Sequence, residues 1–456
     1  MKQAPRVGII SLGCAKNLVD TEIMLGHLDR HGCEYVLEPG DADIIVINTC
    51  GFIGPAREES IRTILETAEL KKTGRLKRLV VAGCMVQRYR EQLLANLPEV
   101  DAFIGLDELP KVIESAGIAS LGGPATVAPS GPSLSLYDHL APRHLATPSW
   151  TAYLKIAEGC DHACSFCAIP SFRGAFRSRT QDDLVAEAER LAAAGVRELN
   201  LIAQDTSHYG RDRGEPDGLP RLLEALNAID DLHWIRIHYL YPNTVTDKLI
   251  EAMAGLPKVV NYVDMPLQHA DSAVLSRMLR GGSADSHIKL LERFRRRMDD
   301  PAMRTTLIVG FPGETEDEFG HLLDFVREVR FDHVGVFTYS HEEDTSAHRL
   351  EDDVPQELMD ERRGAVMELQ AGIAGERNKE RLGRTVEVLV EGTHPETELL
   401  LTGRTAGQSQ DVDGQVLIND GQAEPGSFVQ VELTETAGYD LVGRIVPAGD
   451  RSTGAP

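Results

Sequence analysis

Three cysteines lie within eight residues of one another in the segment EGCDHACSFCAIP, at Cys160, Cys164 and Cys167. Cysteine thiolates hold iron–sulfur clusters, and three of them leave one iron of a four-iron cluster without a protein ligand. A catalytic metal needs such an open position. The alternative is a structural zinc site, for which His162 is the local candidate for the fourth ligand. The C-x3-C-x2-C spacing just past a strand favours the catalytic cluster.

Three more cysteines follow short apolar runs near the amino terminus. Cys14 follows VGIISL by one glycine, Cys50 directly follows DIIVINT, and Cys84 directly follows RLVVAG. The carboxyl ends of parallel strands share one edge of a sheet, where open α/β folds bind ligands. We therefore expect a second three-cysteine cluster with an open iron, against the alternative of three unrelated buried cysteines. Cys33 precedes its apolar run and is expected at the opposite edge as a structural residue.

The elements that must position these cysteines can be read from the apolar pattern. Runs at 7–12, 43–49, 78–83 and 101–105 lack period-2 alternation and are separated by helix-length segments. This pattern is typical of a parallel sheet covered on both faces. We predict an open parallel α/β domain over 1–125. Residues 126–149, rich in Pro, Gly and Ser, are predicted to be a linker or a loose excursion.

Strand–helix alternation resumes at Thr151 and gives six strand signals before residue 340. Long crossovers between them predict a partial parallel (β/α)6 barrel over 150–375. A charged amphipathic helix is expected over 356–383. Short alternating strands with glycine-containing turns then predict a small antiparallel β-barrel over 376–447, followed by a polar tail, 448–456. The predicted fold class is α/β.

The chain is strongly acidic, with 47 Lys and Arg against 71 Asp and Glu and a formal net charge of -24 over 456 residues. A field of this sign attracts basic partners and repels bare nucleic acid. Direct binding to nucleic acid is therefore not expected.

The cysteine distribution and the apolar runs indicate the compartment. Seven unevenly spread cysteines in a long chain do not form the pattern of a disulfide-stapled secreted domain. The apolar stretch from Val7 to Leu12 falls short of the roughly 7–15 residues of a signal-peptide core. No run approaches the roughly 18 apolar residues that span a bilayer. We expect a cytoplasmic protein without a membrane partner.

The three-cysteine loop resembles that of the radical S-adenosylmethionine superfamily, whose hallmark is C-x3-C-x-aromatic-C, with Phe166 as the aromatic residue. The resemblance implies that the open iron binds S-adenosylmethionine and that cofactor cleavage yields a radical that abstracts hydrogen. No catalytic side chain beyond the cluster ligands is expected. Residues at strand ends that the resemblance and the glycine pattern place near the cofactor are Gln204, Asp205, Gln268, Gly310, Gly313, Glu314 and Phe337.

Two cluster sites, an amino-terminal α/β domain, a radical barrel and a carboxyl-terminal unit similar to a TRAM domain together resemble the methylthiotransferase family. The resemblance implies two 4Fe-4S clusters, held by Cys160, Cys164 and Cys167 and by Cys14, Cys50 and Cys84. In the family, one S-adenosylmethionine methylates a sulfide at the second cluster and another opens a substrate C–H bond. An electron donor is then required.

Two branches of this family differ in substrate. SLGCAKNLVDTE, residues 11–22, resembles the branch that modifies an aspartate of ribosomal protein uS12, whereas the transfer-RNA branch typically has GCQMN where this chain has GCAKN. Residues 376–447 contain six Lys or Arg against thirteen Asp or Glu, which suits a basic protein better than phosphates, although acidic surface can also serve solubility alone. We expect methylthiolation of the aspartate β-carbon of uS12. The alternatives are a transfer-RNA adenosine methylthiotransferase and a non-catalytic iron–sulfur carrier.

Overall fold

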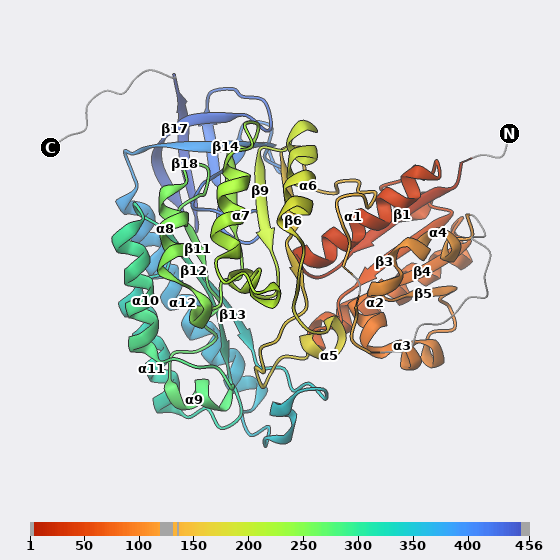
Figure 1. The fold of residues 1–456 in the computed structure, drawn as a ribbon, viewed down its shortest axis with the longest axis horizontal. Helices are drawn as coiled ribbons and strands as arrows, with labels where there is room; N and C mark the ends of the chain where they lie inside the picture. Colours follow the sequence, from red (N-terminus) through yellow and green to blue (C-terminus); the bar gives the residue numbers. More distant parts are fainter. Residues whose placement is uncertain (1–3, 119–130, 135, 448–456) are drawn as a thin grey trace. The chain divides into compact units, whose positions relative to one another are not determined.

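The computed structural model describes residues 4–118, 131–134 and 136–447 (Figure 1). The chain forms two compact units. The first consists of the described residues up to 191 together with 200–216 and 340–350, and the second contains the rest of the described chain. No helix in these described ranges is long and apolar enough to cross a membrane. The predicted tail, residues 448–456, lies outside the described residues.

The first unit begins with a five-stranded parallel sheet in the order β2-β1-β3-β4-β5. Its strands are β1 (Arg6–Ser11), β2 (Glu34–Tyr35), β3 (Ile44–Thr49), β4 (Arg78–Gly83) and β5 (Ala102–Ile104). Strand β3 is buried along its whole length, as expected for β-branched residues in a strand covered on both faces. The four apolar runs form β1, β3, β4 and β5, so the predicted open parallel sheet is confirmed.

Helices cover this sheet, as Figure 1 shows. They are α1 (Ala15–Arg30), α2 (Gly54–Thr73), α3 (Cys84–Asn96) and α4 (Val112–Ser115), with 3-10 turns η1 (Pro39–Asp41) and η2 (Leu106–Lys111). Ile64 of α2 and Leu93 of α3 share one core with Ile45 and Val81 of the sheet. Helices α2 and α3 therefore cover the same face.

The described part of the predicted linker is attached to the first unit. Arg143 is buried and binds Glu22 at 2.6 Å and Glu187 at 2.7 Å. Ser133 donates a hydrogen bond to Asp107. These residues are therefore not a loose excursion, because buried ion pairs hold them, whereas 119–130 and 135 lie outside the described residues.

The rest of the first unit carries the three-cysteine loop and the strands around it. Its elements are β6 (Thr151–Lys155), β7 (Ala157–Glu158), α5 (Ile169–Arg173), β8 (Arg177–Ser178), α6 (Gln181–Ala193), β9 (Glu198–Ile202), η3 (Thr206–His208), η4 (Arg211–Arg213) and η6 (Ser346–Arg349). Strand β9 is divided between the units, and β10 (Trp234–Ile237) belongs to the second unit.

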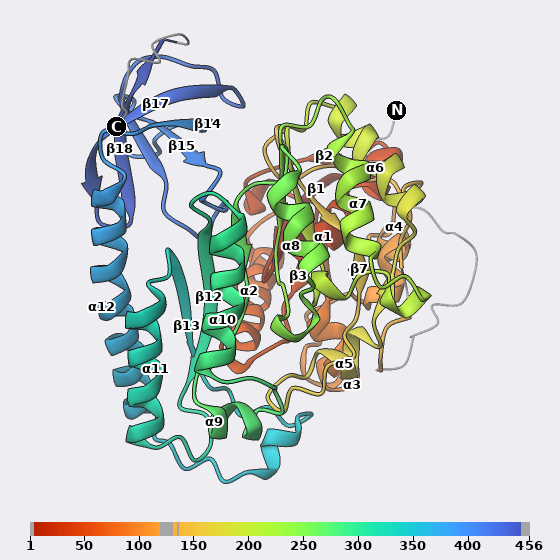
Figure 2. The ribbon, with the colours of Figure 1, turned by 60° about the vertical axis from the view of Figure 1, so that its left-hand side comes forward.

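The second unit contains a parallel sheet in the order β11-β12-β13. The strands of this sheet and the helices of the second unit that precede the carboxyl-terminal barrel are, in chain order, α7 (Gly218–Asn227), η5 (Pro242–Thr244), α8 (Asp247–Gly255), β11 (Tyr262–Asp264), α9 (Ser272–Arg277), α10 (Ala284–Arg297), β12 (Ala302–Val309), α11 (Glu316–Val329), β13 (His333–Thr338) and α12 (Gln356–Glu380). Figure 2 shows α11 and α12 running alongside β13. All six strands predicted between 151 and 340 form, and the helix predicted over 356–383 forms as α12.

The carboxyl-terminal strands close into a small barrel in the order β14-β15-β16-β18-β17. They are β14 (Thr385–Thr393), β15 (Leu401–Thr405), β16 (Val416–Asp420), β17 (Phe428–Ala437) and β18 (Asp440–Val446). The barrel is confirmed, but the prediction that it is antiparallel throughout is wrong, because β16 and β18 pair in parallel. Directions cannot alternate all the way around a closed ring of five strands, so one pair must be parallel.

A buried histidine on α10 predicts how stability depends on pH. His287 is 2% exposed, and neither ring nitrogen has a hydrogen-bond partner among the described residues. Burial, assisted by Arg280, lowers the pKa of His287 to about 4. The unfolded chain takes up this proton near pH 6.5, so stability contributed by the neutral ring is present above that pH and is lost as the pH falls toward about 4, by up to about 3 kcal/mol.

The measurement is the urea midpoint of the metal-free chain between about pH 7 and about pH 4.5, compared with His287→Phe. The variant removes the titrating group, so its midpoint should fall less over this range. Equal pH dependence in both proteins would contradict the prediction.

Candidate metal centres

The three amino-terminal cysteines lie at one edge of the first sheet. Ser11, Asn48 and Ala82 stand beside one another across β1, β3 and β4. Cys14 caps the start of α1, Cys50 lies between β3 and α2, and Cys84 is the first residue of α3. Cys14 thus follows the end of its strand by three residues, and Cys50 and Cys84 directly follow theirs, all at the carboxyl edge of the sheet. Cys33 directly precedes β2 and belongs to the opposite edge.

Glycines let these cysteine-bearing loops approach one another closely. Gly13 has a φ of +89°, and a Cβ placed there would lie 2.8 Å from the Cβ of Cys50. A Cβ on Gly51 would lie 2.7 Å from the Cα of Met85 and 3.2 Å from the carbonyl carbon of Cys84. Contacts this short exclude any side chain. The Cys14, Cys50 and Cys84 loops are therefore in direct contact.

The electrostatic surroundings show that the three thiols interact. Burial raises the pKa of Cys84 to about 12, Arg173 opposes the rise, and the thiols of Cys14 and Cys50 add to it. Burial also raises the pKa of Cys50. At Cys14 burial alone would raise the pKa, but Lys16 and Arg173 outweigh it and hold the value below its usual range. Arg173 thus counteracts the effect of burial on all three thiols.

The second group of cysteines lies in the loop between β7 and α5. The Cys160 amide donates to the Gly174 carbonyl at 3.0 Å, and the Cys167 amide donates to the Cys164 carbonyl at 3.1 Å. Gly159 has a φ of +82°, and a Cβ there would lie 2.1 Å from the Ala175 carbonyl oxygen. The turn that presents Cys160 therefore requires glycine at position 159.

Burial and charged groups around this loop raise the pKa of Cys160, and one of these groups, Asp205, binds His162. Burial raises the pKa of Cys160 to about 12, with further contributions from Cys164, Asp205 and Asp161. His162 Nε2 lies 2.7 Å from a carboxylate oxygen of the buried Asp205. The structure thus shows His162 held by a carboxylate through Nε2, next to the first of the three cysteines.

Both groups of cysteines fit iron–sulfur clusters by the chemistry of their donors. Each supplies three thiols near a carboxyl strand end, and iron bound to them would remove the thiol protons that burial otherwise retains. In the described part of the chain, no three Cys, His, Asp or Glu side chains are already arranged so that they could hold a metal ion. The ligand assignments therefore stay predictions.

Two of the residues predicted to bind the cofactor lie in the first unit. Gln204 Nε2 donates to Glu158 at 2.9 Å. Asp205 is buried and accepts hydrogen bonds from the Ser207 hydroxyl at 2.6 Å and the His208 amide at 3.2 Å. Asp205 therefore fixes the loop around His162, a contact that the sequence did not predict.

The other predicted residues lie in the second unit. Gln268 has a φ of +73°, an uncommon conformation for a non-glycine residue. The Glu314 carboxylate is buried, accepts from the Gly310 amide at 2.9 Å and binds Arg362 at 2.8 Å. Glu314 thus shapes the loop that contains Gly310 and Gly313. Phe337 is 52% exposed on β13.

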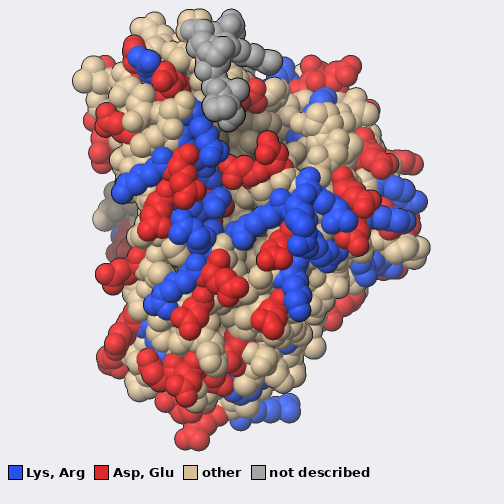
Figure 3. Space-filling model, turned by 90° about the vertical axis from the view of Figure 1, so that its left-hand side faces the viewer, with Lys and Arg blue, Asp and Glu red and all other residues tan. Residues whose placement is uncertain are grey.

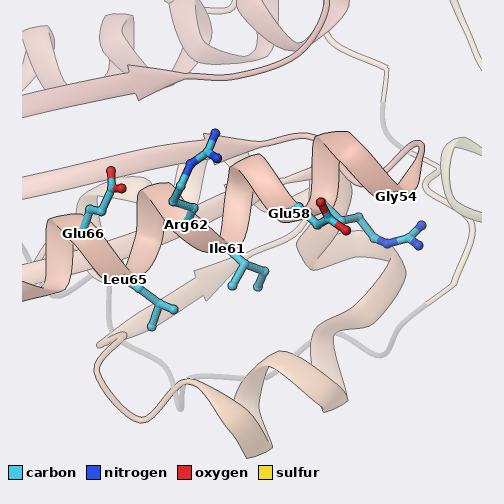
Figure 4. A pocket seen from close by; sticks show the side chains of 7 residues that line it. Gly54, Glu58, Ile61, Arg62, Leu65 and Glu66 are labelled. Carbon is cyan, nitrogen blue, oxygen red and sulfur yellow. The ribbon is translucent and has the colours of Figure 1, made fainter. Parts of the chain in front are cut away.

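The surface also has a hollow of about 570 Å³ along α2 (Figure 4). No cysteine lines it, and it begins four residues after Cys50. Its lining residues are Gly54, Arg57, Glu58, Ile61, Arg62, Leu65 and Glu66. The hollow is therefore separate from the residues that carry the predicted chemistry.

Three family models match the chain in succession. Residues 6–105 match Uncharacterized protein family UPF0004, residues 154–326 match the Radical SAM superfamily, and residues 382–446 match the TRAM domain. The matched order is that of the predicted domains.

Curated relatives match over nearly the whole chain. The ribosomal protein uS12 methylthiotransferase RimO of Myxococcus xanthus is 50% identical over 442 residues, which cover 97% of this chain and 92% of that protein. The protein of the same name from Syntrophotalea carbinolica is 47% identical, with 98% of each chain covered. This chain belongs to the RimO family. It is a radical S-adenosylmethionine methylthiotransferase, as the RimO relatives and the Radical SAM match require.

Among solved structures, the radical S-adenosylmethionine methyltransferase TsrM from Kitasatospora setae covers 73% of this chain and 73% of its own, with 15% identity and a TM-score of 0.49. The RimO assignment rests on the curated relatives.

The close contact between Gly13 and Cys50 indicates a substitution that should disrupt only the site of Cys14, Cys50 and Cys84 in this RimO-family chain. Gly13→Ala would strain a backbone with positive φ and place a methyl group 3.2 Å from the Cys50 sulfur. We expect the iron content after anaerobic reconstitution to fall by about half, since one of two four-iron sites is lost. Gly32→Ala is the control, because Gly32 also has a positive φ but nothing lies within 4 Å of its added Cβ. Full iron content in Gly13→Ala would contradict this prediction.

Proposed function

We propose that this protein adds a methylthio group to the β-carbon of an aspartate of ribosomal protein uS12. The observation that carries the proposal is the near full-length similarity to uS12 methylthiotransferases. It is supported by two separate groups of three cysteines, one of them gathered at the carboxyl edge of a parallel sheet.

Each group of cysteines is proposed to hold one 4Fe-4S cluster, Cys160, Cys164 and Cys167 the first and Cys14, Cys50 and Cys84 the second. When bound, the clusters and S-adenosylmethionine supply the radical that opens the C–H bond and the sulfur and methyl group that replace the hydrogen. An external electron donor is required.

The protein's own residues position and shield these groups. Cys84 is buried, whereas Cys14 is exposed, so water is kept from one side of the second site, and water exclusion protects reactive species from side reactions. Asp205 holds His162 and thereby the loop that presents Cys160. Glycines at 13, 51 and 159 permit backbone contacts that no side chain allows.

Seven residues are proposed to line the S-adenosylmethionine site, with different tasks. Gly310 and Gly313 allow close backbone approach because both have positive φ. Glu314 is engaged by Arg362 and by the Gly310 amide, so we assign it to loop shape and not to direct charge contact. The residues of the proposed site are Gln204, Asp205, Gln268, Gly310, Gly313, Glu314 and Phe337.

A protein substrate suits the charge of the chain better than a nucleic acid. Residues 376–447 are acidic, with six basic against thirteen acidic residues. Figure 3 shows Lys and Arg gathered on the face that carries α10, with Asp and Glu among them. On α10, Arg296 pairs with Glu292 and Arg297 with Asp247. Carboxylates thus lie beside the exposed arginines of this face, and with the acidic excess of the chain they support a proposal of no direct nucleic-acid contact. Because uS12 is a ribosomal protein, we propose action in the cytoplasm.

The proposed domain limits follow the observed elements. Helix α4 ends at Ser115 and β6 begins at Thr151, which supports a first domain over 1–125, a linker over 126–149 and a barrel from 150. The end of the barrel domain at 375 falls within α12, so this helix is shared with the TRAM-like domain, 376–447, and the tail is 448–456.

The test is anaerobic incubation of the reconstituted protein with uS12, S-adenosylmethionine and a reductant, followed by peptide mass analysis. We expect one aspartate of uS12 to gain the mass of a methylthio group replacing a hydrogen. Transfer RNA in a parallel reaction should remain unmodified. Modified adenosine with unmodified uS12 would support the transfer-RNA alternative, and the absence of 5′-deoxyadenosine would support an iron–sulfur carrier.

A further inference from the structure

We propose that Arg173 is a positioning residue for the second cluster site: its guanidinium supplies the positive charge next to the Cys84 sulfur and links that site to the loop of Cys160. The inference rests on the proposed function, because it takes Cys84 as a ligand. It concerns a residue that neither the cysteine motifs nor the strand-end pattern singles out.

Arg173 reaches Cys84 from a distant part of the chain. It is the last residue of α5, which begins two residues after Cys167. Helix α5 packs against Cys84, because Phe172 and Cys84 share one small hydrophobic core. Arg173 is 1% exposed, and its Nη2 lies 3.0 Å from the Cys84 sulfur. The helix that follows one cysteine group thus ends at the other.

The sulfur is the nearest acceptor of this nitrogen. The same Nη2 lies 3.2 Å from Asp20 and 3.4 Å from Asn17 Oδ1. The other terminal nitrogen, Nη1, donates to both oxygens of Glu158 at 2.9 Å. One guanidinium nitrogen is therefore assigned to Glu158 and the other is directed chiefly at Cys84.

The charges of the buried group are balanced without the thiol. Two cations, Arg173 and Lys155, face two carboxylates, Asp20 and Glu158, and Lys155 binds Asp20 at 2.5 Å and Glu158 at 2.8 Å. The hollow beside Asp20, Lys155 and Glu158 is only about 20 Å³, room for about one water molecule. Screening is weak in such surroundings, so the Arg173 charge acts strongly on whatever Cys84 binds.

A cation beside a cluster ligand makes the cluster easier to reduce, because the added electron is attracted to it. Net charge and hydrogen bonds to cluster sulfurs are known determinants of reduction potential. Removal of the Arg173 charge should therefore make the second cluster harder to reduce. Glu158 is also bound by Gln204 at 2.9 Å and stands two residues before Cys160, so one arginine connects the two cysteine groups.

The test uses the full chain with Cys160, Cys164 and Cys167 replaced by alanine, so that only the second cluster is observed. In this background Arg173→Gln is combined with Glu158→Gln, which removes the cation beside Cys84 while the buried charges stay balanced. The readout is the ratio of reduced to oxidised cluster at fixed potential, measured by electron paramagnetic resonance. We expect this ratio to fall about tenfold, which corresponds to 59 mV for one electron.

Two further variants separate the charge effect from folding damage. Arg173→Lys keeps the charge and should restore most of the ratio. Arg179→Lys is the matched control: Arg179 is likewise buried and ion-paired, with Asp183 and Glu187, but no cysteine contact is observed for it among the described residues. It should leave the ratio unchanged.

An unchanged ratio in the double variant would overturn the role of Arg173 while leaving the cluster assignment intact, as would a resonance spectrum that neither Arg173→Lys nor Arg179→Lys alters. A background protein with Arg173 in place that forms no cluster at all would instead overturn the ligand assignment, and the inference with it. If the double variant does not fold, the resonance spectra of Arg173→Lys and Arg179→Lys are compared instead. A lysine at 173 cannot reach Glu158 and Cys84 together, so Arg173→Lys should alter the spectrum of the second cluster and Arg179→Lys should not.

Discussion

Replacing Cys160 by alanine is expected to abolish cleavage of S-adenosylmethionine, whereas replacing Cys50 should leave cleavage intact and stop sulfur insertion. The reason is the separation of the cysteines into two groups. Cys160 belongs to the loop after β7, and Cys50 belongs to the carboxyl edge of the first sheet. Loss of the group that performs a reaction returns its rate toward the uncatalysed value, so cleavage should fall by at least about a thousandfold in Cys160→Ala.

The measurement is 5′-deoxyadenosine formed under anaerobic conditions, together with the mass of uS12. Cys33→Ala is the matched control, since Cys33 lies before β2 and away from both groups. It should retain cleavage and transfer. Equal loss of cleavage in the Cys160 and Cys50 variants would contradict separate roles.

Replacing Glu198 by glutamine is expected to cost about 3–5 kcal/mol of folding stability. Glu198 is fully buried and binds Arg236 at 3.1 Å and Arg404 at 2.7 Å. Both arginines are also buried, so the amide would leave Arg236 without its carboxylate partner and Arg404 with only the partly exposed Glu391, 2.7 Å away. The residues come from the start of β9, from β10 and from β15, so the carboxylate joins strand ends to the carboxyl-terminal barrel within the second unit.

The change can be followed by urea unfolding of the metal-free chain. Trp234 provides a fluorescent probe, because it is buried on β10 and its ring lies 4.8 Å from that of Phe428 on β17. Glu251→Gln is the control: Glu251 is exposed and lies 4.0 Å from Arg297, so its loss should cost less than about 1 kcal/mol. A Glu198→Gln protein as stable as the control would show that the buried pairs contribute little.

The first domain illustrates what strand periodicity can predict. The runs at 7–12, 43–49, 78–83 and 101–105 form β1, β3, β4 and β5 within one or two residues. Since parallel strands all point the same way, a cysteine after each strand must lie at the same edge. The meeting of the Cys14, Cys50 and Cys84 loops therefore followed from sequence position alone, although their ligation of iron stays a prediction.

The carboxyl-terminal barrel shows that local sequence patterns do not predict the order and direction of paired strands. Alternation identified the strands and their turns, but the order β14-β15-β16-β18-β17 and the parallel pair of β16 and β18 depend on closure. Alternation describes which side of a strand is buried and carries no information about its neighbours.

By itself, the sequence determined the α/β class, the sites of nearly all strands, the two cysteine groups and the family, because each is encoded in short runs of residues or in spacing along the chain. Only the tertiary structure decided that Arg173 lies against Cys84 and Glu158 and that Glu198 binds Arg236 and Arg404. Arg173 and Cys84 are 89 positions apart in the chain, and Glu198 and Arg404 are 206 apart. A buried long side chain takes the partner that packing brings within reach, and no local periodicity specifies that partner.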